Sequence, residues 1–165
     1  MSKTEIVSII NQKGGVGKTT TAINLAAGLA LKNKKILVID LDPQGNATTG
    51  LGLSNSESSN ETIYAVLNGI KKIPEVIKKT EIQNLDVISS NVDLSGLEVE
   101  TAGDSRRAFI LRDEIMAYLN DSNDIYEYII IDCPPSLSLL TVMALVASNS
   151  LVVPLQTEFF ALEGL

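Results

Sequence analysis

Short apolar runs, most of them rich in β-branched residues, recur along the chain and alternate with longer segments of helical periodicity. Such runs lack alternating polar positions, which is typical of strands buried on both faces of a parallel sheet. The predicted strands are 6–10, 36–39, 85–88, 128–131 and 151–153. Turn-forming residues bound several of them, as the glycines of 14–17 do after the first.

The segments between these strands predict helices. After the first strand, apolar residues recur at i, i+3, i+4, i+7 and i+8, as expected for a helix with one buried face: Ala22, Leu25, Ala26, Leu29 and Ala30. Further helices are predicted over 62–67, 74–79, 106–119 and 139–147, whereas 46–60, rich in Gly, Ser, Thr and Asn, predicts a long surface loop. We therefore expect an α/β fold, a doubly wound and mainly parallel sheet with helices on both faces, forming a single domain over residues 1–165.

The end of the chain does not complete this pattern. Residues 159–162 form the apolar start of a helix, and no later element follows for them to pack against. We therefore expect the domain to be truncated at its C-terminus.

Composition limits the chemistry. Apolar residues make up 45% of the chain and charged residues 20%, the balance of a globular protein. The chain has no histidine and one cysteine, Cys133, which excludes an internal disulfide and leaves carboxylates, lysines, hydroxyls and backbone amides for catalysis. No apolar run reaches the roughly 18 residues that span a bilayer, so we expect a cytoplasmic protein without stable membrane insertion. The net charge of −7 argues against a broad nucleic-acid-binding face on these residues.

The glycine-rich segment that follows the first strand predicts a phosphate-binding loop. Glycines allow the backbone to curl around phosphate oxygens, and the following helix directs its positive N-terminal end at the same anion. Lys18 is placed to reach the β- and γ-phosphates of ATP, and the Thr19 hydroxyl to bind Mg²⁺. A glycine turn with a capping threonine is the alternative, but the order of strand, glycines, Lys-Thr and helix favours the phosphate loop. The expected nucleotide-binding residues are Lys13, Gly14, Gly15, Val16, Gly17, Lys18, Thr19 and Thr20.

Aspartates follow two of the predicted strands. Asp132 comes directly after 128–131, and Asp40 and Asp42 follow 36–39. Ligands of open α/β sheets bind at the carboxyl ends of strands, so these carboxylates are candidates for a Mg²⁺ site, and Asp132 matches the aspartate that holds Mg²⁺ in P-loop proteins. Aspartates at strand ends also cap turns, which is the alternative for each of them.

The loop departs from the usual P-loop pattern, which has glycine at the position of Gln12, and it adds Lys13 before the first glycine. With this deviation the chain resembles the ParA/MinD family of P-loop ATPases, which carry a deviant Walker A motif. The resemblance implies that Lys13 reaches across an ATP-bound homodimer to the phosphates held by the other subunit. It also implies that Asp42 positions or polarises the attacking water and that Asp40 supports the metal. The expected catalytic residues are Lys13, Lys18 and Asp42, and the expected metal residues are Thr19, Asp132 and Asp40.

Three further stretches resemble chromosome-partitioning ParA (Soj-type) proteins within that family: DPQGNAT at 42–48, DCPPS at 132–136 and EFFALEG at 158–164. This resemblance implies an ATPase of chromosome or plasmid partitioning whose ATP-bound dimer binds DNA non-specifically, and which is therefore associated with the nucleoid. A ParB-like activator would stimulate hydrolysis and release it. The family's DNA-contacting and adenine-contacting residues lie in a C-terminal region not present here.

Other classes remain open. A MinD-like membrane-cycling ATPase shares the phosphate loop but needs a C-terminal amphipathic helix. A carrier of an iron–sulfur cluster needs paired cysteines, and Cys133 instead fits a small core residue. A nucleotide used only as a structural switch is disfavoured by Asp42, and Arg106 and Arg107 fit a solvated helix start better than a DNA contact.

Overall fold

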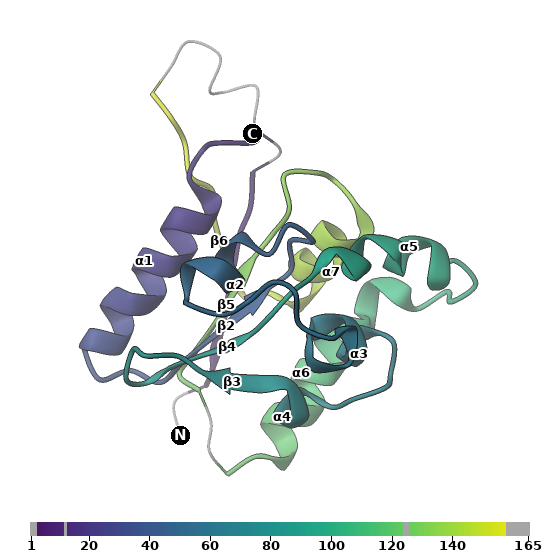
Figure 1. The fold of residues 1–165 in the computed structure, drawn as a ribbon, viewed down its shortest axis with the longest axis horizontal. Helices are drawn as coiled ribbons and strands as arrows, with labels where there is room; N and C mark the ends of the chain where they lie inside the picture. The colour runs from purple at the N-terminus through teal and green to yellow at the C-terminus, as the bar shows by residue number, and fades with distance from the viewer. Residues whose placement is uncertain (1–2, 12, 124–125, 158–165) are drawn as a thin grey trace.

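The computed structural model describes residues 3–11, 13–123 and 126–157 (Figure 1). Its elements in chain order are β1 (Glu5–Ile9), α1 (Lys18–Leu31), β2 (Ile36–Asp40), α2 (Asn46–Gly50), η1 (Ser59–Glu61), α3 (Ile63–Leu67), α4 (Ile73–Val76), β3 (Ile77–Lys79), β4 (Leu85–Ile88), η2 (Val92–Gly96), α5 (Leu97–Glu100), η3 (Arg107–Phe109), α6 (Ile110–Asp121), β5 (Tyr128–Asp132), α7 (Leu139–Ala147) and β6 (Ser150–Val152). All five predicted strands are present within a residue or two of their expected positions.

The described strands form one six-stranded sheet in the order β3-β4-β2-β5-β1-β6. Every neighbouring pair is parallel except β3 and β4, which are antiparallel at one edge. The mainly parallel, doubly wound α/β sheet expected from the sequence is therefore confirmed. In the sheet, β5 lies between β1 and β2. The connection through α1 therefore leaves room for one strand between β1 and β2, and β5 occupies this position later in the chain.

Alternate residues of each central strand face opposite sides, so the sheet has two apolar faces. On one face, Val38 and Ile130 pack with the small residues of α1, including Ala22 and Ala26. On the other face, residues such as Leu37 pack with four helices, and Figure 1 shows these helices on the side opposite α1: α3, α4, α6 and α7. The two layers of helices explain why these strands are apolar at consecutive positions.

The segment 46–60, which we expected to be a surface loop, is partly helical. The segment instead begins with helix α2, in which Ala47 and Thr48 are fully buried. Thr48 is drawn inside because its N–H and hydroxyl both donate to the Asp40 carboxylate. This tertiary contact outweighs the loop tendency of a segment rich in Ser, Gly and Asn.

The segment 74–79, which we expected to be one helix, is not a single helix. The segment is divided between α4 and the edge strand β3, because Ile77 and Lys79 pair with Ile88 and Asp86 of β4. A short apolar run has no periodicity that separates these two structures, and the pairing decides. The expected helix start at 159–162 lies outside the described residues.

Candidate functional site

The glycine segment connects the end of β1 to the start of α1, as predicted. Gly17 adopts φ +86 as the residue before the helix, a left-handed conformation that disfavours other residues. The Lys13 N–H donates to Oδ1 of Asn11 at 2.9 Å, and the Lys18 ammonium donates to the Lys13 carbonyl at 2.8 Å. Lys18 therefore folds back over the loop that it follows, with its ammonium at the loop's open side.

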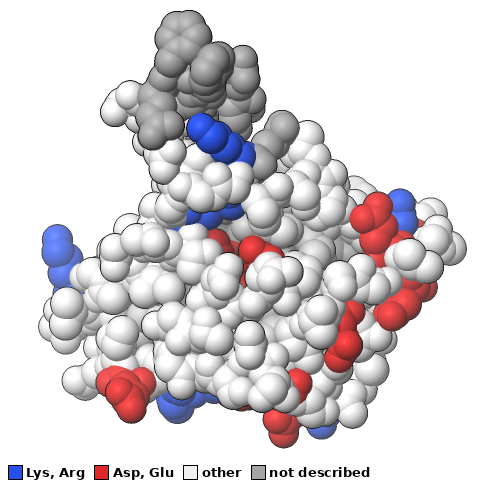
Figure 2. Space-filling model, turned by 45° about the horizontal axis from the view of Figure 1, so that its top comes forward, with Lys and Arg blue, Asp and Glu red and all other residues white. Residues whose placement is uncertain are grey.

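A cavity of about 320 Å³ opens above this loop. It is lined by Gly14, Gly15, Gly17, Lys18, Thr19, Thr20, Asp42, Asn46 and Pro135. Figure 2 shows basic and acidic side chains meeting in a hollow on this side of the molecule. The phosphate-loop residues and Asp42, which are distant in sequence, thus share one cavity.

Asp132 stands at the centre of the strand ends. It pairs in register with Ile9 of β1 on one side and with Asp40 of β2 on the other. The Thr19 hydroxyl donates to its Oδ2 at 2.8 Å, and no other described residue donates a hydrogen bond to its buried Oδ1. A buried carboxylate oxygen without a protein donor suits a bound cation.

Burial shifts the pKa values of Asp132 and Lys18. Loss of solvent raises the pKa of Asp132 to about 7, and the neighbouring Asp40 and Asp42 carboxylates add to the rise, against the opposing effects of Thr19 and Lys18. Burial also lowers the pKa of Lys18, while Asp132 and Asp42 counter that change. A cation placed at Asp132 would favour its ionised form.

Asp42 and Asp40 have different surroundings. Asp42 lines the cavity, and its Oδ1 accepts a hydrogen bond from the Gln44 N–H at 3.0 Å. Asp40 is fully buried and accepts three hydrogen bonds, from the Asp42 N–H and from the N–H and hydroxyl of Thr48. Burial raises the pKa of Asp40 to about 6, although these hydrogen bonds lower it.

The segment after β6 braces the loop. The Asn11 amide donates to the Pro154 carbonyl at 2.9 Å, and the Gln156 amide donates to the Gly15 carbonyl at 2.9 Å. The sequence did not predict either contact, and the only signal was that Asn11 directly follows a predicted strand. Asn46 and Pro135 of the cavity lining were likewise missed, although both lie within or beside motifs that the sequence drew attention to.

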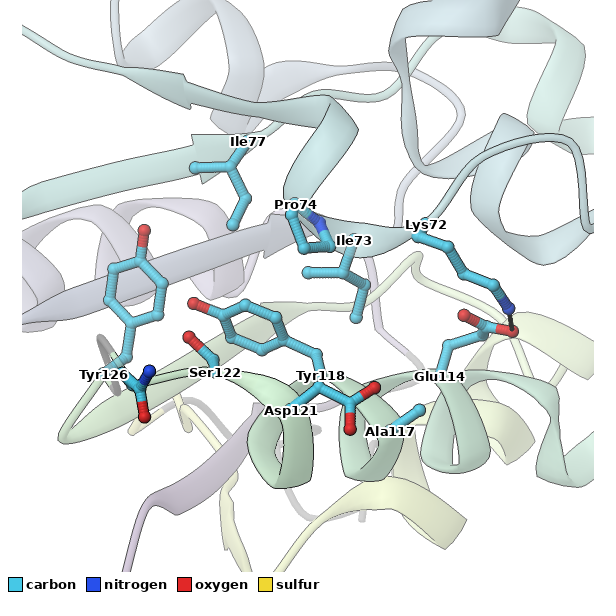
Figure 3. A pocket seen from close by; sticks show the side chains of 11 residues that line it. Lys72, Ile73, Pro74, Ile77, Glu114, Ala117, Tyr118, Asp121, Ser122 and Tyr126 are labelled. Atoms are coloured by element: carbon cyan, nitrogen blue, oxygen red, sulfur yellow. Dashed lines mark hydrogen bonds and ion pairs between the residues drawn. The ribbon is translucent and has the colours of Figure 1, made fainter.

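A larger cavity, of about 830 Å³, lies between α4, β3 and α6 (Figure 3). The Lys72 ammonium on its wall is paired with Glu114 at 2.8 Å, as the dashed line shows. The Tyr126 hydroxyl donates to Asp86. None of its described lining residues belongs to the phosphate loop or to the aspartates at the strand ends. The smaller cavity is instead lined by seven of the predicted site residues: Gly14, Gly15, Gly17, Lys18, Thr19, Thr20 and Asp42.

The residues of the smaller cavity fit ATP and Mg²⁺. An ammonium, hydroxyls and a glycine-rich backbone at a helix start suit phosphate, while a threonine hydroxyl and one carboxylate suit Mg²⁺. Across the described ranges, no three His, Cys, Asp or Glu side chains group closely enough to hold a metal by themselves. Mg²⁺ typically takes one or two carboxylates and completes its shell with phosphate and water oxygens.

Three residues to which the sequence assigned no catalytic role make structural contacts. Cys133 is buried, and loss of solvent raises the pKa of its thiol to about 12, so it is a core residue as predicted. The Arg106 guanidinium pairs with Asp113 at 3.0 Å and lies over the Phe109 ring. Arg107 donates to the Glu98 carbonyl. Both arginines thus make local surface contacts at the start of α6.

Comparisons with known proteins show the family to which the chain belongs. A family model described as an AAA domain matches residues 4–165. The chromosome partitioning protein ParA of Caulobacter vibrioides is 51% identical over 160 residues, which cover 97% of this chain and 59% of that protein. The chain thus spans about 59% of the length of this curated relative.

Solved structures share the fold, and some of them hold a bound nucleotide. Cobyrinic acid a,c-diamide synthase from Mycobacterium smegmatis, with a bound ATP analogue and magnesium, superposes with a TM-score of 0.88 at 33% identity, covering 96% of this chain and 63% of that one. A putative plasmid partition protein from Borrelia burgdorferi B31, bound to AMPPNP, gives 0.80 at 33% identity, covering 98% and 65%. None of the helices within the described residues combines the length and apolar content of a membrane-spanning segment.

Proposed function

Because the chain belongs to the AAA-domain family and is a ParA/MinD-type P-loop ATPase close to chromosome-partitioning ParA, we propose that it hydrolyses Mg-ATP in chromosome or plasmid partitioning. The observation that carries this proposal is the shared cavity of the phosphate loop and Asp42, beside the Thr19–Asp132 pair. These groups come from three different strand ends and meet where ligands of such sheets bind.

Each residue has a role that follows from its position. The loop backbone and the Lys18 ammonium neutralise the charge of the phosphates, and Thr19 with Asp132 holds the metal. Bound Mg²⁺ supplies further charge neutralisation at the phosphate oxygens. Asp42, which lines the same cavity, orients the attacking water. Phosphoryl transfer depends mainly on such positioning and charge compensation, so the lack of histidine is no obstacle.

Turnover also depends on a second subunit in this proposal. Lys13 stands at the loop, and no described carboxylate forms an ion pair with its ammonium. Its ammonium acts in trans on the phosphates of the partner subunit, in the manner of an arginine finger. ATP would therefore be needed for the homodimer, and the homodimer for hydrolysis.

The ATP-bound dimer binds DNA without sequence preference, and a ParB-like activator releases it by stimulating hydrolysis. Residues 1–165 carry a net charge of −7, which opposes contact with the phosphate backbone. We therefore assign the DNA contact to residues outside this range. The nucleoid is the cellular site that this activity requires.

The experiment measures retention of the full-length protein on duplex DNA and on anionic lipid vesicles, each with ATP or ADP and Mg²⁺. We expect ATP-dependent retention on DNA that weakens steeply with salt. ATP-dependent retention on vesicles instead of DNA would replace this function with that of a MinD-like membrane-cycling ATPase. Equal retention with ATP and ADP would contradict both.

A further inference from the structure

The backbone of Asp42 is held on both sides by buried polar side chains. Its N–H donates to Oδ1 of Asp40 at 3.1 Å, and its carbonyl accepts from the hydroxyl of Ser90 at 2.8 Å. Ser90 follows β4, and the two strands β2 and β5 separate β4 from β1, the strand before the phosphate loop. Asp42 is therefore held between its own strand and the neighbouring strand end.

Thr48 of α2 closes the connection between these two side chains. Its hydroxyl donates to Oδ2 of Asp40 at 2.7 Å and accepts from the Ser90 N–H at 3.0 Å. The hydrogen bonds thus form a closed ring through Asp42, Asp40, Thr48 and Ser90. Asp40, Thr48 and Ser90 are each 0% exposed, so water does not compete for their hydrogen bonds.

Close packing at Gly45 keeps the ring compact. Gly45 has φ +66, and a Cβ at this position would stand 3.3 Å from the Ser90 carbonyl oxygen and 3.1 Å from Cβ of Asn55. Only glycine combines this conformation with so close an approach. The turn after Asp42 is therefore pressed against the end of β4, where Ser90 is located.

We infer that Asp40, Thr48 and Ser90 are positioning residues that hold the Asp42 peptide, and thereby its carboxylate, at the cavity wall. The inference rests on the proposed function, because it gives these residues a part in orienting the water that Asp42 acts on. Both Asp40 oxygens already accept hydrogen bonds, which favours this role over direct metal ligation. A displacement of about 1 Å at a reacting group typically costs about 100-fold in rate, so a ring that fixes a backbone has a measurable effect.

The test uses Thr48→Val in the full-length protein, which preserves the shape of the side chain but removes both hydroxyl hydrogen bonds. Thr49→Val is the matched control, because the adjacent Thr49 is exposed and its hydroxyl contacts only the Gly45 and Asn46 carbonyls. We expect kcat of Thr48→Val to fall about 10- to 100-fold while its Mg-ATP affinity stays within about 2-fold of the control. Thr48→Ser, which keeps the hydroxyl, should restore most of kcat.

Ser90→Ala provides a second variant if Thr48→Val does not fold, and it should show the same separation of kcat from affinity. If both variants turn over like Thr49→Val while Asp42→Ala remains slow, the positioning role is refuted and the proposed function stands. Loss of kcat, affinity and cooperative melting together would show a purely structural role and would also refute it. Unchanged turnover in Asp42→Ala would show that Asp42 does not orient the water. It would refute both the positioning role and the role of Asp42 in the proposed function.

Discussion

The Thr19 hydroxyl donates a hydrogen bond to Oδ2 of Asp132 at 2.8 Å across a sequence separation of 113 residues. Thr19 lies in the first turn of α1 and Asp132 ends β5, so the contact joins the end of the phosphate loop directly to the neighbouring strand end. The other oxygen of Asp132 is buried, and no described group donates to it. The contact brings together two of the three residues expected at the Mg²⁺ site, and it leaves one oxygen of Asp132 without a hydrogen-bond donor among the described residues.

The burial of Asp132 predicts how the stability of the fold depends on pH. The pKa of Asp132 is about 7 in the folded protein, above its ordinary 3.8, so the folded state retains a proton that the unfolded state loses. The stabilisation is fully present below pH 3.8 and is lost as pH rises through about 7. Three pKa units correspond to a change on the order of 4 kcal/mol.

Thermal melting without Mg²⁺ or nucleotide, at pH values from 4 to 8, measures this dependence. The wild-type melting temperature should fall relative to that of Asp132→Asn as pH rises toward 7, because the variant cannot ionise. Parallel pH profiles of the two proteins would show that Asp132 ionises normally. Asp40, whose pKa is about 6, should add a smaller dependence of the same sign to both proteins.

Lys13 and Lys18 should differ in what they affect. Lys13→Ala should keep the Mg-ATP affinity of the monomer, because its phosphate contacts are in the partner subunit, but it should lose the ATP-dependent dimer. Light scattering coupled to size exclusion, with ATP and with ADP, measures the mass directly. A Lys13→Ala dimer of normal stability would disprove the trans role.

Asp42→Ala should bind Mg-ATP and dimerise but hydrolyse ATP slowly, so that its dimer persists. The expected loss in kcat is about 100-fold or more, the usual range for a general base or water-positioning group. Steady-state turnover with DNA and the activator present is the appropriate measurement. Turnover at the wild-type rate would mean that another group orients the water.

Much of this site could be predicted because its signals are local. Lys18 and Thr19 belong to one short motif, and Asp132 directly follows an apolar strand, so the parallel-sheet rule brings them to one edge. The same rule placed Asp42 at the cavity even though β5 separates β1 from β2. These predictions needed only strand ends and their common direction.

The remaining features depend on contacts between distant segments. Helix α2 exists where a loop was expected because Thr48 binds Asp40, and β3 is a strand because it pairs with β4. Neither partner is visible in the local pattern of apolar and polar residues. Gln156 reaches Gly15 over 141 positions, a contact that no spacing rule identifies. Polar residues that hold a site in place are therefore harder to predict than those within its motif.

In the proposed function, the glycine loop binds the phosphates of Mg-ATP through Lys18. Titration calorimetry of Mg-ATP into Lys18→Ala, with Lys32→Ala as a control at the exposed far end of α1, tests it most directly. Loss of a charge-assisted contact costs about 1.5–3 kcal/mol, so Lys18→Ala should bind roughly 10- to 150-fold more weakly. The Lys32→Ala affinity should match the wild type, and equal affinity for all three proteins would contradict the phosphate-binding role of the loop.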